Sequence, residues 1–290
     1  MAAGRGKRER VLKAAVAKAR RFLKRPEVIA VGIGQRQTSG RWLAGRPGIV
    51  VKVDWKLGQA GLRRRKRHPL PTSITVVVDG ASHRVLVDVQ ETRGELVGRL
   101  QGLVGGCVTA GATVRGSVSA IVSVGAETCV LVSGHVAGSG GVRLNTGGLD
   151  GTTRDPIFSS RLDHCVLDTD SALPHGAVML VDALPLLGIA PIWSVGTDTV
   201  AYFHRASTGA RVATVIRHFD MTAPFAYPWG TVQMKGLIVT DGVTVDGDSG
   251  ALLYDNGFRA IGTLIGQFGG ESYFIPCETA FNSLGLLLSA

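Results

Sequence analysis

The decisive stretch of the sequence is Val245-Asp246-Gly247-Asp248-Ser249-Gly250-Ala251-Leu252-Leu253, which lies between two apolar runs, 236–244 and 251–266. Glycine lets a backbone approach a substrate closely and adopt strained dihedrals, so the stretch suits a hydroxyl held on a tight turn. The N–H groups of Gly247 and Ser249 can then point into one cavity and bind a developing oxyanion. Taken alone, the same residues also fit an ordinary β-turn.

A serine hydroxyl becomes a strong nucleophile only beside a histidine that is itself oriented by a carboxylate. His135 follows an apolar run, 128–132, and begins a glycine-containing turn. Asp170 follows the apolar pair Val166-Leu167 and begins the sequence Asp-Ser-Ala-Leu. These elements stand in the order His, Asp, Ser, with separations of 35 and 79 residues. Asp168 is the alternative to Asp170 for the carboxylate.

The composition predicts a globular protein rich in β-structure. Hydrophobic residues make up 45% of the 290, and 40 glycines are scattered among short Val, Ile and Leu runs, which indicates many tight turns. Runs 117–124 and 128–132 predict a hairpin, and residues 278–288 predict a closing helix. Further strands are expected near Val166, Val178, Pro191, Val200, Arg211, Thr231, Ala251, Ala260 and Ser272. This spacing is typical of β-barrels rather than βαβ units.

The first hundred residues predict a separate, smaller unit. Apolar residues recur at helical spacing over 7–25, and Pro26 ends the helix. Four strands are expected, the last two joined by a hairpin at Asp79-Gly80: 28–33, 49–55, 73–78 and 84–89. The glycine-rich stretch 92–106 then indicates a linker. We therefore expect a basic α+β domain at residues 1–102 and a β-rich domain at residues 103–290.

Charge is divided between these two parts. Residues 1–100 hold 23 Lys and Arg against 7 Asp and Glu, whereas residues 101–290 hold 9 against 15. The basic helix fits binding to nucleic acid or to an anionic membrane. The basic run 63–68 fits binding to polyanions or an import signal, or else an exposed loop. We favour a helix that packs its apolar stripe on the neighbouring sheet and keeps its charges in solvent. Nucleic-acid binding ranks last, because the basic stretches contain few aromatic residues.

Location and cofactors are predicted from what the sequence lacks. The basic N-terminus has no apolar signal region, and no run of about 18 apolar residues is present, so we expect a cytoplasmic protein without a transmembrane segment. The four cysteines are far apart and form no C-x-x-C, which argues against zinc and for free, mostly buried thiols. No metal and no organic cofactor are expected.

With its three elements in order, the chain resembles the trypsin-like serine proteases over residues 103–290. The matching segments are 131–136 (Leu-Val-Ser-Gly-His-Val), 170–173 (Asp-Ser-Ala-Leu) and 247–250 (Gly-Asp-Ser-Gly). The resemblance implies a mainly β protein, in which a chymotrypsin-like double β-barrel of two six-stranded barrels follows the small α+β domain. It also implies a catalytic cleft between the barrels.

The resemblance assigns the site residues. His135 is the general base, Asp170 orients it, and Ser249 is the nucleophile. Asp170 is preferred to Asp168 because of its Asp-Ser-Ala-Leu context. The oxyanion hole consists of the N–H groups of Gly247 and Ser249. No activation sequence of the Arg-Ile-Val-Gly type precedes the barrels, so a freed N-terminal amine is not expected as the partner of the acid before the serine.

The implied function is that of an intracellular serine endopeptidase, which hydrolyses peptide bonds through an acyl-enzyme intermediate and takes proteins or peptides as substrates. Segments 28–34 and 49–53 resemble the N-terminal extension of intracellular trypsin-like proteins from bacteria, a group that includes the plant narrow-leaf proteins. The alternative is a protease-like fold that has lost turnover and binds peptides or partner proteins. Assembly into a homo-oligomer stays open.

Overall fold

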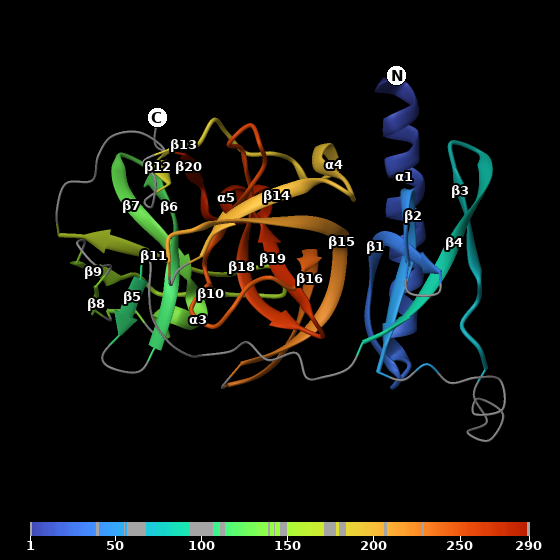
Figure 1. Ribbon diagram of the computed structural model, residues 1–290, viewed down its shortest axis with the longest axis horizontal. Helices are drawn as coiled ribbons and strands as arrows, with labels where there is room; N and C mark the ends of the chain where they lie inside the picture. The colour runs from blue at the N-terminus through green and yellow to red at the C-terminus, as the bar shows by residue number, and fades with distance from the viewer. Residues whose placement is uncertain are drawn as a thin grey trace.

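Most of the chain is β-strand, and its strands form two large sheets. The computed structural model in Figure 1 describes residues 2–38, 41–54, 56, 68–92, 107–110, 114–138, 140–141, 143–145, 150–170, 178–179, 184–205, 208–227 and 229–288. A first barrel and the N-terminal unit lie on opposite sides of a second barrel. The expected linker, 92–106, and the basic run, 63–68, lie almost wholly outside the described residues.

The N-terminal helix packs its apolar stripe on a sheet. Helix α1 (Ala2–Ala19) continues as a 3-10 helix, η1 (Arg20–Lys24). Its buried side chains belong to one hydrophobic core with the strands beneath them: Leu12, Ala15, Val16, Ala19 and Phe22. The helix therefore packs as predicted, and the sheet rather than a membrane or nucleic acid covers its apolar face.

Four strands complete the N-terminal unit: β1 (Val28–Thr38), β2 (Arg41–Val53), β3 (Ser73–Val78) and β4 (Ala81–Glu91). The turn between β3 and β4 has positive φ at both Asp79 (52°) and Gly80 (73°), the geometry of the predicted two-residue hairpin. β2 pairs with β1 on one side and, in parallel, with β4 on the other. The four strands predicted from the sequence are confirmed.

The first barrel is a closed ring of six strands. Its order is β11-β7-β6-β5-β8-β9, and β9 pairs back to β11. The bounds are β5 (Cys107–Ala110), β6 (Val114–Val124), β7 (Glu127–Ser133), β8 (Arg143–Asn145), β9 (Asp150–Thr153) and β11 (Asp163–Thr169). β10 (Ile157–Phe158) pairs with β11. Large side chains of alternate residues, such as Val130, Val132 and Leu167, fill the interior.

The second barrel also closes with six strands, in the order β14-β17-β18-β19-β16-β15, and β15 pairs back to β14. Its strands are β14 (Val200–His204), β15 (Arg211–Tyr227), β16 (Gly230–Asp241), β17 (Leu252–Tyr254), β18 (Ala260–Phe268) and β19 (Glu271–Pro276). Phe225, Met234 and Ile275 lie fully buried in its core. The predicted fold class, a double β-barrel after a small α+β unit, is thereby confirmed.

The N-terminal unit and the second barrel share one sheet. β1 pairs antiparallel with β15, where Val31 lies opposite Thr222 and Gly34 opposite His218. The core under α1 continues into the second barrel and includes Ile216 and Phe219. The two predicted domains, 1–102 and 103–290, are therefore joined by strand pairing and by a common core. The boundary between them stays a prediction.

Gly34 permits this close pairing. A Cβ at Gly34 would overlap the imidazole of His218, which is fully buried. Gly32 and Gly34 thus make room for Met221 and His218 of β15.

Two expected elements differ in the structure. The closing helix, predicted over 278–288, is α5 (Cys277–Leu284), and Gly285 ends it in the left-handed conformation with φ of 62°. Residues Leu286–Leu288 then form β20, which pairs with β6. The strand expected near Pro191 is instead a short helix, α4 (Ile192–Val195), because proline cannot donate a hydrogen bond to a strand ladder.

The remaining short strands, β12 (Val178–Met179) and β13 (Leu184–Pro185), pair with each other. No helix among the described residues is long and apolar enough to cross a membrane.

A buried ion pair ties the N-terminal unit to the second barrel. The ammonium of Lys52, on β2, contacts one carboxylate oxygen of Glu271, on β19. His218 Nε2 lies 3.2 Å from the other oxygen. The Lys52 side chain is only 2% exposed, and burial lowers its pKa to about 7.

This burial predicts a stability that depends on pH. Between about pH 7 and pH 10 the unfolded chain holds the Lys52 proton more tightly than the folded chain does, so the free energy of unfolding rises with pH. We expect Lys52→Met to lose this rise, at most about 1.4 kcal/mol per pH unit, in urea denaturation at about pH 7, 8 and 9. Lys56→Met, at an exposed lysine, is the matched control and should keep the wild-type slope. Parallel curves for Lys52→Met and wild type would contradict the prediction.

Candidate active site

His135 and Asp163 form the centre of the candidate site. β7 ends at Ser133, and the short helix α3 (Gly134–Ala137) follows at once, which places His135 at the end of the first barrel. Asp163 opens β11, the antiparallel neighbour of β7. Its carboxylate accepts two hydrogen bonds from His135, one from the backbone N–H at 2.8 Å and one from ring Nδ1 at 2.6 Å. Both side chains are almost fully buried.

A tyrosine from the second barrel completes the surroundings of Asp163. Tyr227, the last residue of β15, donates its hydroxyl to Asp163 Oδ2 at 3.0 Å. Burial alone would raise the pKa of the Asp163 carboxyl, but the nearby His135 and its hydrogen bonds hold that pKa below its usual range. Asp163 is therefore an anion at neutral pH, fixed from both barrels. Phe158 and Trp229 pack beside the Tyr227 ring, with centroids 6.1 and 5.0 Å from it.

The structure does not place Asp170 or Asp168 beside the histidine. Asp170 is 46% exposed and ion-paired with Arg143. Asp168 is ion-paired with Arg154 at 2.7 Å. Both lie at the far end of β11 from Asp163, and a strand advances about 3.3 Å per residue, so seven residues span roughly 20 Å. The expected pairing of Asp170 with His135 is therefore wrong, and Asp163 takes that position.

The turn that carries Ser249 is fixed against the first barrel. Ser117 of β6 donates its N–H to the carbonyl of Ser249 at 2.6 Å and its hydroxyl to that of Gly247 at 3.1 Å. Ser119, also on β6, donates to the carbonyl of Gly250 at 2.6 Å. These hydrogen bonds hold a turn of the second barrel on a strand of the first.

Gly250 brings the serine turn against the strands that end beside the histidine. Its φ is 94°, and a Cβ there would overlap the carbonyl oxygen of Ser117 and lie 3.4 Å from Oγ of Ser133. Ser133 stands two residues before His135, so the Ser249 turn and the His135 turn meet at the same end of the first barrel. Nε2 of His135 is buried and makes no hydrogen bond to any described residue. It is the ring nitrogen left to accept a proton.

The predicted oxyanion donors lie on the same turn. Gly247 has φ of 93°, a conformation that favours glycine. In the described part of the chain, the N–H groups of Gly247 and Ser249 donate no backbone hydrogen bond, whereas those of Asp248, Gly250 and Ala251 each do. Neither amide of the predicted oxyanion hole is therefore used in the backbone hydrogen bonds of this turn.

Arg205 faces the acid that precedes the serine. The Asp248 carboxylate is fully buried and accepts the N–H of Val245 at 2.9 Å. Arg205 Nε lies 4.0 Å from the same carboxylate, and its Nη2 donates to the carbonyl of Val243. An internal arginine thus stands near this acid, in agreement with the absence of an activation sequence.

We expect Arg205→Met to lower the free energy of unfolding by about 1–3 kcal/mol, because it removes a cation from the neighbourhood of a buried carboxylate and one donor from the Val243 carbonyl. Urea denaturation measures the change. Arg161→Met, at an exposed arginine, controls for the loss of one positive charge and should stay within about 0.5 kcal/mol of wild type. Equal stabilities of the two variants would contradict this role of Arg205.

One cluster has the residue types of a metal site. Glu127, Cys129 and Asp168 bring possible ligand atoms within 4.8 Å of one another. Arg154, however, ion-pairs with both carboxylates, and burial raises the pKa of the Cys129 thiol to about 11. A bound cation would have to displace the guanidinium and deprotonate the thiol. The arrangement therefore favours an ion-pair cluster.

No protein-family model matches the sequence, and no curated protein does. Solved structures do match. Nocardiopsis protease is 20% identical, with a TM-score of 0.51 over 65% of this chain and 98% of that one. Thermobifida fusca protease A is 25% identical, with the same TM-score and coverage. A glutamic acid specific serine protease is 20% identical, with a TM-score of 0.50 over 64% of this chain and 100% of that one. The chain therefore has the chymotrypsin-like double β-barrel fold found in serine proteases.

Proposed function

We propose that the protein is a serine endopeptidase with Ser249 as nucleophile, His135 as general base and Asp163 as the carboxylate that orients the base. The observation that carries the proposal is the buried His135–Asp163 pair, whose free Nε2 lies at the end of the barrel that holds the Ser249 turn. Proteins or peptides are the proposed substrates, as the likeness to proteases suggests.

The chemistry follows from these positions. Nε2 of His135 takes the Ser249 hydroxyl proton while Oγ attacks the peptide carbonyl, and the N–H groups of Gly247 and Ser249 stabilise the oxyanion. The histidine then gives its proton to the leaving amine, which leaves an acyl-enzyme. Water, deprotonated by the same nitrogen, hydrolyses the ester and restores Ser249. Asp163 holds the Nδ1–H tautomer and stabilises the imidazolium throughout.

We further propose that the chain belongs with the intracellular trypsin-like proteins that its N-terminal segments resemble. The pairing of β1 with β15 supports this proposal, because it places the N-terminal strands in the same sheet as the second barrel. The cytoplasmic location and the oligomeric state stay predictions.

A fluorophosphonate probe tests the proposed activity, because it reacts with an activated serine and spares ordinary hydroxyls. We expect one adduct per chain, located on Ser249 by peptide mass spectrometry. Urea-unfolded protein and the Ser249→Ala variant should take up none. A folded wild-type protein that stays unlabelled, while trypsin in the same tube reacts, would favour a peptide-binding module without turnover.

A further inference from the structure

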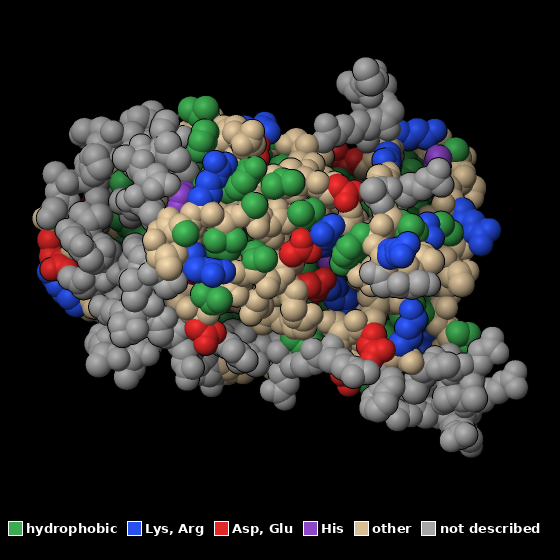
Figure 2. Space-filling model, in the orientation of Figure 1, with side chains coloured by type: hydrophobic (Ala, Val, Ile, Leu, Met, Phe, Trp, Pro, Cys, Tyr) green, Lys and Arg blue, Asp and Glu red, His purple; other side chains and the backbone are tan. Residues whose placement is uncertain are grey.

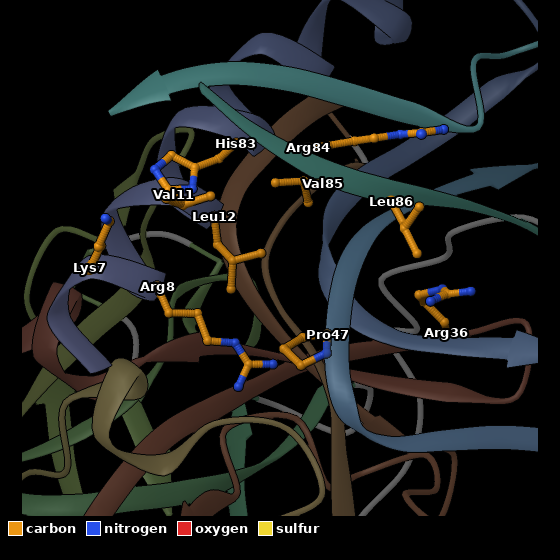
Figure 3. A pocket seen from close by; sticks show the side chains of 10 residues that line it. All are labelled: Lys7, Arg8, Val11, Leu12, Arg36, Pro47, His83, Arg84, Val85 and Leu86. Carbon is orange, nitrogen blue, oxygen red and sulfur yellow. The ribbon is translucent and has the colours of Figure 1, made fainter. Parts of the chain in front are cut away.

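The N-terminal unit contains a forked pocket, lined by residues of α1, β1, β2 and β4. In Figure 1 these elements lie across the second barrel from β7 and α3. β2 and β4 pair in parallel only over residues 49–53 and 87–91. Before these residues the two strands diverge, because β2 continues in its hairpin with β1 and β4 in its hairpin with β3. The first turns of α1 lie across the fork, as Figure 3 shows. The resulting cavity has a volume of about 440 Å³.

The floor of the forked pocket is apolar. Val11 and Leu12 reach it from the helix, and Pro47, Val85 and Leu86 from the two strands (Figure 3). Leu86 is 40% exposed, so part of this apolar surface is open to solvent. A second cavity of about 220 Å³ shares Leu12 and Pro47 with the first and extends the apolar surface towards the second barrel.

The rim of the forked pocket is positive. Four cations surround the floor: Lys7, Arg8, Arg36 and Arg84. Within the described residues, none of the four lies within ion-pair distance of a carboxylate. Glu9 pairs with Lys13 and Asp79 with Arg10, and Asp88 accepts the N–H of Gln37, the residue after Arg36. Figure 2 shows the same bias, with Lys and Arg side chains gathered over the N-terminal unit.

The fork also leaves parts of two strand edges without a partner strand, although at Gly45 the N–H donates to Asp198 and the carbonyl accepts from Arg8. Over residues 81–86, β4 pairs only with β3, and over residues 41–48, β2 pairs only with β1, as far as the described chain shows. Unpaired N–H and C=O groups on a strand edge can pair with an added extended segment. A ligand with an extended backbone, an aliphatic side chain and flanking carboxylates would satisfy the edge, the floor and the rim together.

We propose that the forked pocket binds an extended acidic peptide segment of a partner or substrate protein. A leucine-like side chain of that segment occupies the floor between Leu12 and Leu86, and its carboxylates pair with the four cations of the rim. This site is independent of the proposed peptidase activity, because no residue of the fork belongs to the His135–Ser249 site. Nucleic acid would satisfy the rim, and a base could stack on His83, which also lines the pocket. The five apolar residues of the floor are aliphatic, however, and favour the aliphatic side chain of a peptide.

Fluorescence anisotropy tests the proposal with the full chain carrying Ser249→Ala, so that no probe is cleaved. The probe is a fluorescein-labelled heptapeptide, Glu-Glu-Leu-Glu-Leu-Glu-Glu. We expect saturable binding at physiological salt, a loss of at least about tenfold when Arg36→Glu is added, and a similar loss when serine replaces both peptide leucines. Lys24→Glu is the matched control: it makes the same charge change at an exposed position of η1 and should leave the affinity within about twofold.

Circular dichroism must first show that the two variants keep the wild-type fold. Equal affinities of the Arg36→Glu and Lys24→Glu proteins would overturn the proposal, as would a peptide that does not bind. A single-stranded oligonucleotide of equal charge provides the last comparison. If it binds more tightly than the peptide and loses that affinity with Arg36→Glu, the fork is a nucleic-acid site and the peptide proposal is wrong.

Discussion

Replacing Ser249 with alanine is expected to lower the turnover of a fluorescent casein by about 10⁴ to 10⁶-fold, because the substitution removes the proposed nucleophile. The Ser249 side chain is only 6% exposed, and the hydrogen bonds that fix its turn use backbone carbonyls at 247, 249 and 250. Alanine keeps all of these bonds. The thermal midpoint should therefore stay close to that of wild type, and the loss should appear in the rate alone.

Ser82→Ala, at an exposed serine in the β3–β4 hairpin, is the matched control and should keep wild-type turnover. A folded Ser249→Ala protein that cleaves within tenfold of wild type would show that the nucleophile lies elsewhere. A wild-type protein with no turnover of any tested substrate, but with a fluorophosphonate-reactive Ser249, would instead indicate a substrate narrower than casein.

The sequence was sufficient to predict where Ser249 and His135 lie in the fold. Ser249 lies on the tight turn that its flanking glycines indicate, and His135 follows a strand, as predicted. Their catalytic roles stay predictions. Strand alternation and turn residues likewise predicted the hairpins around Asp79 and Gly125, both of which the structure contains.

The acid beside His135 was not predicted correctly, because which acid lies there depends on strand register. β11 runs antiparallel to β7, with His164 opposite Ser133, so the start of β11 lies beside the end of β7. Asp163 at that start reaches the histidine, whereas Asp170 lies past the opposite end. A search for an acid at the start of the strand that pairs with β7, in place of the match to Asp-Ser-Ala-Leu, would have identified Asp163. Tyr227 gave no local signal, because its contact joins residues 64 apart on different barrels.

The sequence did not predict that the N-terminal unit and the second barrel share one sheet, because strand pairing between distant residues leaves no local pattern. The pattern of β1 predicts a strand but not its partner, and β15 lies nearly two hundred residues further along the chain. Because β15 is 17 residues long, it can pair both with strands of the second barrel and with β1. The change from a basic to an acidic composition after residue 100 therefore describes the surface charge of the two parts. It does not mark a boundary in the hydrophobic core, because the core under α1 includes residues of the second barrel.

Asp163→Asn tests the corrected carboxylate, and we expect it to lower kcat by about 10⁴-fold with little effect on KM. The asparagine amide has nearly the same shape, but its NH₂ group can donate to Nδ1 of His135. The ring proton then moves to Nε2, and that nitrogen can no longer accept a proton from Ser249. Nitrogen-15 NMR of the imidazole at about pH 8 should accordingly show the Nδ1–H tautomer in wild type and the Nε2–H tautomer in the variant.

Asp170→Asn is the matched control, because it makes the same change at the acid that the sequence favoured. It breaks only an exposed ion pair with Arg143, and exposed pairs of this kind contribute little to stability. Turnover should stay within about twofold of wild type, with an unchanged imidazole tautomer. If Asp170→Asn instead lost activity as severely as Asp163→Asn, the buried pair of Asp163 and His135 would be structural, and the carboxylate would have to approach the histidine through a rearrangement of β11.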